Sequence, residues 1–318
     1  MKRVLIYIVL YLVSVSAYGQ QEHLYTQFAF NKIAFNPAVA GENNFTSITG
    51  INRSQWSGLV GAPQTQAINV NLGTISDKYG FGLSLLKNKV GIQDKLEIAG
   101  QYAYKLKLNK STLNLGLQFS GRRYTTDFTD PSLIAIDGFE LDPSIERSKY
   151  SNTVLNIGLG VYFKSENIYF GFAIPRIIEG DIDLESENII TKEERHMYAM
   201  TGFKLELSQD WAYHPQFFFK VAEQSPFNLD FLSLFSYQDK IYLGGNIRAG
   251  GSQNSLLNSF DIVLGFQFTP NIFAGMSYDF NLTDLSQYEN GSFELSLTYS
   301  FEKSNLPKRI SNPRYFPR

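Results

Sequence analysis

Hydrophobic and polar residues alternate with a period of two along much of this chain. Between residues 96 and 108, apolar side chains take the even positions and polar ones take most of the odd positions. The same alternation recurs in residues 112–120, 260–269 and 292–301. A period of two places the two sets on opposite faces of a β-strand. The pattern therefore predicts a chain built mainly of strands.

Fourteen strands are predicted from this alternation and from the polar breaks between the segments. They cover residues 44–54, 64–74, 78–88, 93–107, 111–123, 152–164, 167–177, 195–207, 210–222, 226–237, 240–250, 256–268, 271–282 and 290–302. Strands in soluble proteins cluster near 5–6 residues, and these segments are about twice as long. A tilted strand needs about 9–11 residues to cross a bilayer. The lengths therefore favour strands that span a membrane.

The connections between the predicted strands alternate between short and long. The short ones are at residues 76–77, 108–110, 165–166, 208–209, 238–239 and 269–270. The longer ones are at residues 55–63, 89–92, 124–151, 178–194, 223–225, 251–255 and 283–289. Outer-membrane barrels have an even strand number, short periplasmic turns and longer extracellular loops. We therefore predict an all-β fold, a transmembrane antiparallel β-barrel of about fourteen strands over residues 44–302, with both ends of the mature chain on the periplasmic side.

A secreted β-sandwich or a β-propeller is the alternative, because its strands would also alternate. The predicted strands are too long for either fold, and no repeat of 40–50 residues marks propeller blades. The polar face is rich in Gly, Ser, Asn and Gln, as a water-filled lumen would be. Charged residues such as Lys204, Glu206 and Lys220 fall on the polar face or near strand ends, away from lipid. A membrane barrel fits these features better.

The first nineteen residues predict a signal peptide. Lys2 and Arg3 precede ten apolar residues, and small residues follow up to Gly19. The apolar run is shorter than the roughly 20 residues of a spanning helix, and a buried N-terminal helix is the alternative. Export followed by cleavage before Gln20 is expected. Because the chain has no cysteine, a lipid anchor on an N-terminal cysteine and any disulfide are excluded.

Composition adds two points. The chain has 19 Tyr and 26 Phe with only 18% charged residues, and no later apolar run is as long as a membrane helix. An exported chain of this kind can enter a membrane only through strands. Its net charge of −2 and pI near 6.0 give no reason to expect nucleic acid as a partner.

Candidate chemistry is sparse. The histidines His23, His196 and His214 lie far apart in the sequence, and none belongs to a metal-spaced pair. A barrel hydrolase would need a Ser near a His with an orienting Asn or Asp. The loops 124–151 and 178–194 are acidic, and calcium accepts carboxylate oxygens, yet no twelve-residue calcium loop appears. We therefore expect no enzyme activity, no cofactor and no metal, and interpret both acidic loops as solvated surface loops.

Two segments flank the predicted barrel. Residues 20–43 contain Phe28, Phe30 and Phe35, which are too apolar to remain in water without cost. Asn36-Pro37 then supplies a turn towards the first strand. We expect this segment beneath the barrel or inside its lumen, and a partner-binding peptide is the alternative. The tail, residues 303–318, has five basic residues and three prolines and is expected to be a disordered periplasmic end or a contact for a periplasmic partner.

Several stretches resemble a known family. These are LYTQFAFNKIAFNPAVAG after the predicted signal peptide, NRSQWSGLVGAPQTQAINVN at residues 52–71, YGFGLSLLKNKVGIQDKLEIAGQYAYKL, and AGMSYDFNLTDLSQYENGSFELSLTYSF near the end. In this order they resemble the PorP/SprF-like outer-membrane proteins of the type IX secretion system of Bacteroidota. The resemblance covers nearly the whole predicted mature chain. The short cysteine-containing ending common in that family is absent here.

The resemblance implies a non-enzymatic barrel in the bacterial outer membrane. It would help to export a secreted adhesin or other cargo, or attach it to the cell surface, through the cargo's type IX C-terminal domain. The partners implied are that cargo, outer-membrane lipid, and periplasmic components of the secretion and gliding motility machinery. A transporter or porin for small molecules is the alternative function, since fourteen strands also suit uptake barrels.

Seven residues are candidates for contact with a partner. Phe28, Phe35, Asn36 and Pro37 lie in the N-terminal segment, and Arg53, Gln55 and Trp56 lie where the first predicted strand reaches the outer surface. An aromatic residue beside an arginine is typical of binding hot spots. For Trp56, membership in the aromatic belt at the membrane interface is the alternative.

Overall fold

A computed structural model describes residues 22, 25–43, 45–75, 78–131, 133, 148–183, 190–222, 227–250 and 256–301. The predicted signal peptide, the basic tail, His23 and parts of the two acidic loops, residues 132, 134–147 and 184–189, lie outside the described residues. Within these ranges, no helix is long and apolar enough to cross a membrane.

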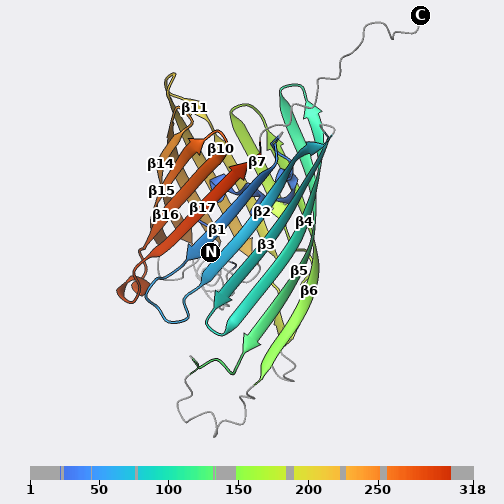
Figure 1. Ribbon diagram of the computed structural model, residues 1–318, viewed down its shortest axis with the longest axis vertical. Helices are drawn as coiled ribbons and strands as arrows, with labels where there is room; N and C mark the ends of the chain where they lie inside the picture. Colours follow the sequence, from blue (N-terminus) through green and yellow to red (C-terminus); the bar gives the residue numbers. More distant parts are fainter. Residues whose placement is uncertain are drawn as a thin grey trace, which may run out of the picture.

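One antiparallel sheet closes on itself to form a barrel (Figure 1). Its strands are β1 (Ser47–Ser54), β2 (Gln64–Ile75), β3 (Tyr79–Val90), β4 (Gln93–Leu108), β5 (Ser111–Asp127), β6 (Lys149–Lys164), β7 (Ile168–Ile174), β10 (His196–Phe203), β11 (Leu205–Glu206), β12 (Trp211–Ala222), β13 (Asn228–Tyr237), β14 (Ile241–Gly250), β15 (Leu257–Thr269), β16 (Ile272–Asn281) and β17 (Ser292–Ser300). Closure comes from the pairing of β1 with β17 and of β10 with β12. Because β10 and β11 follow one another beside β12, the 15 segments make fourteen positions around the barrel.

The predicted fold is therefore confirmed, and each of the fourteen predicted strands matches one position of the barrel. One connection was predicted wrongly. β3 runs to Val90 and β4 begins at Gln93, so the link predicted as a longer loop at 89–92 is a two-residue turn. The sequence also gave no sign of the short hairpin β8 (Asp181–Asp183) and β9 (Ile190–Lys192), nor of the 3-10 turn η4 (Asp284–Gln287).

The two faces of the barrel wall are inverted relative to those of a soluble protein. Apolar side chains such as Leu264, which is 39% exposed, point outward, whereas Gln101, Asn246 and Asp261 point inward and are buried. An outward apolar face and a polar interior are the pattern of a barrel surrounded by lipid. The face assignment predicted from sequence period is confirmed at these positions.

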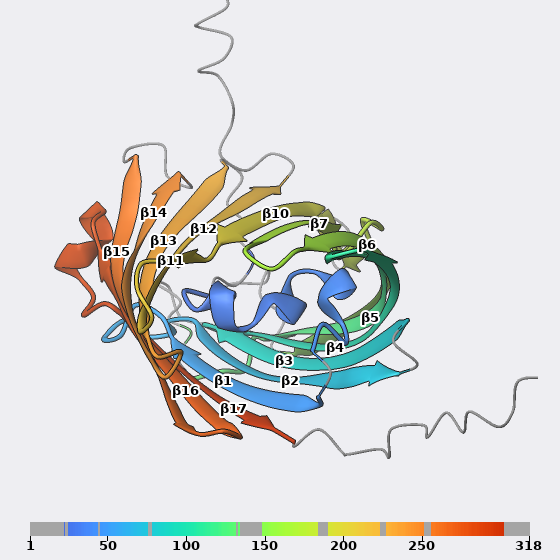
Figure 2. The ribbon, with the colours of Figure 1, turned by 90° about the horizontal axis from the view of Figure 1, so that it is seen from above.

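The interior holds the beginning of the described chain. We call residues 25–43 the lumen segment. It contains three single-turn 3-10 helices, η1 (Phe28–Phe30), η2 (Lys32–Ala34) and η3 (Pro37–Val39). Figure 2 shows these short helices enclosed by the ring of strands.

The lumen segment runs from the end of the barrel with the long loops to the end with the short turns. Just before it, Glu22 contacts Arg122 in the part of β5 near the long loop that follows it. At its other end, Gly41 accepts a hydrogen bond from Lys105, close to the turn between β4 and β5. Of the two places expected for this part of the chain, beneath the barrel or inside its lumen, the structure shows the lumen. Because Glu22 lies at the long-loop end, the expectation that the mature chain begins on the side of the short turns is wrong at this residue.

The long loops are expected on the outside of the cell, and cysteine labelling tests this orientation. In this cysteine-free chain, Val60→Cys lies on the 55–63 loop at a side chain that is 92% exposed, and Lys110→Cys lies in an opposite short turn. On intact cells, an impermeant maleimide should label the first variant and not the second, because only extracellular loops are reachable. Labelling of Lys110→Cys alone would show that the barrel has the reverse orientation.

Candidate functional site in the barrel lumen

Aromatic contacts fix the middle of the lumen segment to the wall. The ring of Phe28 stacks on Phe218 of β12 with centroids 5.1 Å apart, and Phe35 contacts the same ring at 4.6 Å. Phe35 also packs edge-on against Tyr198 of β10 at 5.7 Å. Phe28 and Phe35 are 1% and 3% exposed. Burial of a large apolar side chain stabilises by about 1.5–3 kcal/mol, so these two residues hold the segment firmly.

The Asn-Pro pair forms a polar clamp. The Asn36 side chain accepts a hydrogen bond from the Ala38 amide at 2.9 Å and so caps η3. Pro37 follows as the first residue of that turn, where its missing N–H costs nothing. The Asn36 amide nitrogen also donates to the Val161 carbonyl of β6 at 3.0 Å. One side chain thus both shapes the segment and ties it to the barrel.

Two glycines let the segment approach the wall closely. A Cβ on Gly116 of β5 would lie 2.2 Å from the backbone nitrogen of Ala38, and one on Gly80 of β3 would lie 2.0 Å from the carbonyl oxygen of Ala40. Any side chain at either position would collide with the backbone of the segment. The wall is therefore shaped to receive this segment.

A buried ion network holds the start of the lumen segment. Arg53 of β1 pairs with Asp279 of β16 at 2.6 Å and with Glu294 of β17 at 3.1 Å. Glu294 also accepts a hydrogen bond from the Thr26 amide at 2.8 Å, and the Gln27 side chain donates to the Glu294 carbonyl at 2.9 Å. We call these five residues the Arg53 network.

Further charges continue this network across the neighbouring strands. Arg248 of β14 pairs with Asp230 of β13 at 2.7 Å, and Lys220 of β12 pairs with the same carboxylate at 2.8 Å. Asn246 bridges Asp230 and Asp261 with hydrogen bonds of 3.2 and 2.7 Å. Buried charges are costly unless they are paired and hydrogen-bonded. Each charge on this side of the lumen has an opposite charge nearby, but Lys220 Nζ and Asp261 Oδ1 are buried without a hydrogen bond.

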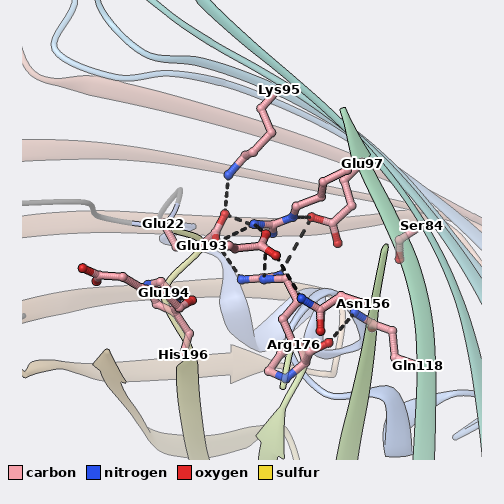
Figure 3. A network of polar contacts seen from close by, with 12 residues as sticks. Glu22, Ser84, Lys95, Glu97, Gln118, Asn156, Arg176, Glu193, Glu194 and His196 are labelled. Atoms are coloured by element: carbon pink, nitrogen blue, oxygen red, sulfur yellow. Dashed lines mark hydrogen bonds and ion pairs between the residues drawn. The ribbon is translucent and has the colours of Figure 1, made fainter. Parts of the chain in front are cut away.

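A second network surrounds Glu22 near the long-loop end (Figure 3). Its carboxylate lies 2.6 Å from Arg176 and 3.1 Å from Arg122, and it also pairs with Lys95 of β4. Arg122 in turn pairs with Glu193 at 2.9 Å. A residue that precedes the lumen segment thus sits among three cations.

Charges also hold the far end of the lumen segment. Glu42 accepts hydrogen bonds from Lys164 at 2.6 Å and from the Tyr162 hydroxyl at 3.1 Å. Lys32 lies over the Tyr169 ring at 4.5 Å. Burial lowers the pKa of Lys32, against the opposing effect of Glu42. Burial alone would raise the pKa of Glu42, but Lys32 and Lys164 hold it below its usual value.

The segment does not fill the lumen completely. A hollow of about 300 Å³ remains beside it towards the short-turn end. Its lining is mainly polar and includes Asn69, Asn71, Lys164 and Thr298.

The structure brings five of the seven candidate contact residues into the interior. Phe28, Phe35, Asn36, Pro37 and Arg53 are all buried. A partner outside the barrel does not reach them while the lumen segment is in place. Their contact with a partner stays a prediction, and the structure shows only their role in holding the segment.

The other two candidates lie at the long-loop rim. Gln55 and Trp56 are half-buried, and the Trp56 amide donates to Ser292 Oγ at 3.1 Å. The backbone of Trp56 has φ of 51°, a left-handed conformation that is uncommon for a bulky residue. Contact of these residues with a partner also stays a prediction.

The described part of the chain contains no assembled catalytic triad around its two histidines. His214 Nε2 lies 2.9 Å from Ser236 Oγ, but the nearby Asp239 accepts from Ser236 at 3.4 Å and does not orient the imidazole. His196 Nδ1 lies 3.0 Å from the Glu194 carbonyl oxygen, which is not a catalytic partner. Within the same described residues, no three potential ligands are grouped to hold a metal.

Most of the charged lumen residues, apart from Arg53 and Lys220, were not identified from the sequence. Arg122 and Glu97 are charged residues on the polar face of long strands, well inside their ends. A charge on the inward face of a spanning strand needs a partner, because an unpaired one is expensive. This signal identifies the residues, but it does not say which strands lie opposite.

Comparisons with known proteins agree with the fold. Residues 17–299 match the family model described as type IX secretion system membrane protein PorP/SprF. No curated protein matches the sequence. Among solved structures, the CymD monoaromatic hydrocarbon channel is similar, with 11% identity, a TM-score of 0.52, and coverage of 89% of this chain and 94% of that chain. A Pseudomonas aeruginosa FadL homologue has 12% identity, a TM-score of 0.49, and coverage of 84% and 93%. These likenesses concern the fold alone.

Proposed function

Because this chain belongs to the PorP/SprF family of type IX secretion system membrane proteins, we propose that it helps to export a secreted protein or attach it to the cell surface. The barrel recognises the C-terminal domain of an adhesin or similar cargo and performs no chemistry on it. A link to gliding motility is part of the same proposal, through periplasmic components of the secretion machinery.

The observation that carries this proposal is the occupied lumen. Aromatic packing, the Asn36 clamp and two ion networks fix the lumen segment inside the barrel. A barrel for free diffusion needs an aqueous channel, which such a segment obstructs. An occupied barrel with a built rim of loops supports a binding role over a diffusion role.

The rim gives the cargo a surface to contact. The 55–63 loop is tied to the 282–291 connection, where the Ser57 amide donates to the Gly291 carbonyl at 2.8 Å and the Asn290 amide donates to the Ser57 carbonyl at 2.7 Å. Loops that are held in place lose less conformational freedom on binding. This pair of loops, with Trp56 at its base, is the proposed contact.

Deletion of the gene tests the proposed function. Large secreted adhesins with a type IX C-terminal domain should be depleted from the surface of the deletion strain, and re-expression of the intact chain should restore them. Surface proteomics on intact cells measures both. If every such adhesin keeps its normal surface level, the proposal fails and small-molecule transport becomes the leading function.

Trp56→Ala tests the contact surface. Loss of an aromatic anchor should weaken binding of a C-terminal cargo domain by about 2 kcal/mol, or about thirtyfold. The barrel level and its heat-modifiable band should stay as in the unmodified protein. Co-purification with the cargo domain is the measurement. If the barrel level falls together with binding, Trp56 belongs to the aromatic belt.

A further inference from the structure

The outer face of the barrel has an apolar hollow of about 490 Å³ across β17, β1, β2, β3 and β4. These strands lie side by side in the barrel wall (Figure 1). Outward apolar side chains line the hollow, and each is between 38% and 55% exposed: Ile68, Leu85, Leu96, Leu295 and Leu297.

A glycine creates the floor of this hollow. Gly50 of β1 faces outward between Leu297 of β17 and Ile68 of β2, its partners in the sheet. A Cβ at Gly50 would have no atom within 4 Å. The two neighbouring side chains therefore stand on either side of an empty strip of backbone, which is a shape that a single extended hydrocarbon chain fills.

Polar residues close the hollow on the side of the long loops. One row of paired residues runs from Asn52 of β1 to Gln66 of β2 and Lys87 of β3. The row continues through Leu96 of β4 to Arg123 of β5. Lys87 and Arg123 thus lie on either side of Leu96, which itself lines the hollow.

These two cations have no partner among the described residues. Neither the Lys87 nor the Arg123 side chain makes a hydrogen bond or an ion pair there, and both side chains are exposed on the outward face. Lys89, by contrast, lies 3.8 Å from Asp130. An anionic group bound at the long-loop end of the hollow would complement the unpaired charges.

Lys87 follows an apolar stretch on the outward face of β3. The outward residues of β3 from Tyr79 to Leu85 are all apolar, and Lys87 is the next outward residue. At about 3.3 Å per residue this stretch is roughly 20 Å long along the strand, which is roughly 15 Å along the membrane normal at a tilt of about 40°, against an apolar band of ~25 Å. Lys87 is thus the first outward charge on the long-loop side of the apolar stretch of β3.

We propose that the hollow is a binding site for one anionic membrane lipid. An acyl chain lies over Gly50 between Ile68 and Leu297, and the phosphate of the head group contacts Lys87 and Arg123. The site lies on the face that the bilayer covers, which favours a lipid over a soluble partner. The inference is independent of the proposed role in secretion, because it rests on the outer face alone.

Native mass spectrometry of the purified full-length barrel tests the site. The barrel is incubated in detergent with equal amounts of phosphatidylglycerol and phosphatidylcholine that have the same acyl chains. The barrel should retain one phosphatidylglycerol in preference to phosphatidylcholine, because each nearby cation should increase the affinity for the anionic lipid by about fivefold. K87Q together with R123Q should reduce the ratio of the two bound lipids to near one. Gly50→Leu should reduce retention of both by about fourfold for each methylene it displaces.

Two matched variants serve as controls. Lys110→Gln removes a cation at the opposite end of the barrel, and Gly100→Leu adds a side chain at another outward glycine with no atom within 4 Å. Both should retain lipid as the unmodified barrel does, and the heat-modifiable band checks folding of every variant. Equal retention of the two lipids by the unmodified barrel, or an unchanged preference in the double variant, overturns the proposal. Displacement of a co-purifying protein by Gly50→Leu with lipid retention unchanged overturns it too.

Discussion

Replacing Arg53 with alanine should lower the free energy of unfolding by about 3–5 kcal/mol. The Arg53 side chain is 1% exposed and is the cation that pairs with both Asp279 and Glu294 at 3.1 Å or less. Its removal leaves two neighbouring carboxylates in the lumen with one cation fewer. The midpoint of urea-induced unfolding in detergent, followed by intrinsic fluorescence, measures the loss.

Arg123→Ala is the matched control for this substitution. Arg123 lies on the outward face and has no partner in the described part of the chain, so its loss in detergent should change stability by less than about 0.5 kcal/mol. Equal unfolding midpoints for Arg53→Ala and Arg123→Ala would contradict the importance of the Arg53 network.

Leu264→Arg should destabilise the barrel in a membrane by about 2–4 kcal/mol. Leu264 points outward in the middle of β15, and its partners Leu243 and Met276 are outward and apolar as well. An arginine there would place a charge in the hydrocarbon core. The fraction of heat-modifiable barrel in outer-membrane preparations should fall.

Gln267→Arg gives the comparison on the same strand. Gln267 faces the lumen near the short-turn end, where the side chain donates to the Thr269 carbonyl at 2.7 Å. This position does not incur the membrane penalty, so the barrel level should change little. Equal losses from Leu264→Arg and Gln267→Arg would show that the inward and outward faces have been assigned wrongly.

The barrel wall was predictable because its physics is local. Alternation fixes which face each residue takes, and short polar breaks mark where strands end. The connection at residues 89–92 was predicted wrongly as a longer loop. Lys89 and Val90 carry no sequence signal that distinguishes a loop from a continuing strand. The wall continues through them to a turn at Gly91, which has a positive φ of 57°.

The lumen was only partly predictable, because its contacts join residues far apart in the sequence. The apolar character of Phe28 and Phe35 shows that the segment needs cover. It does not identify Phe218 as the contact. Arg53 was selected as a rim residue beside Trp56, but it lies on the inward face and pairs with β16 and β17, more than 200 positions later.

Glycine substitution separates an occupied lumen from an open one. Gly116→Leu would collide with the lumen segment at Ala38 and should displace it, whereas Gly100→Leu points outward into free space and should not. Single-channel recordings in planar bilayers should therefore show more frequent and larger openings for Gly116→Leu than for Gly100→Leu. Identical recordings from the two variants would show that the segment does not control passage.

The unmodified full-length barrel gives the most direct test of the central claim, that the lumen is closed by the protein's own N-terminal residues. The purified protein is reconstituted into planar bilayers at a level of insertion confirmed by immunoblotting of the recovered membrane. Because the lumen segment is held by aromatic packing and ion pairs, we expect no steady open-channel current. A reproducible, long-lived open pore in the unmodified protein would contradict the account.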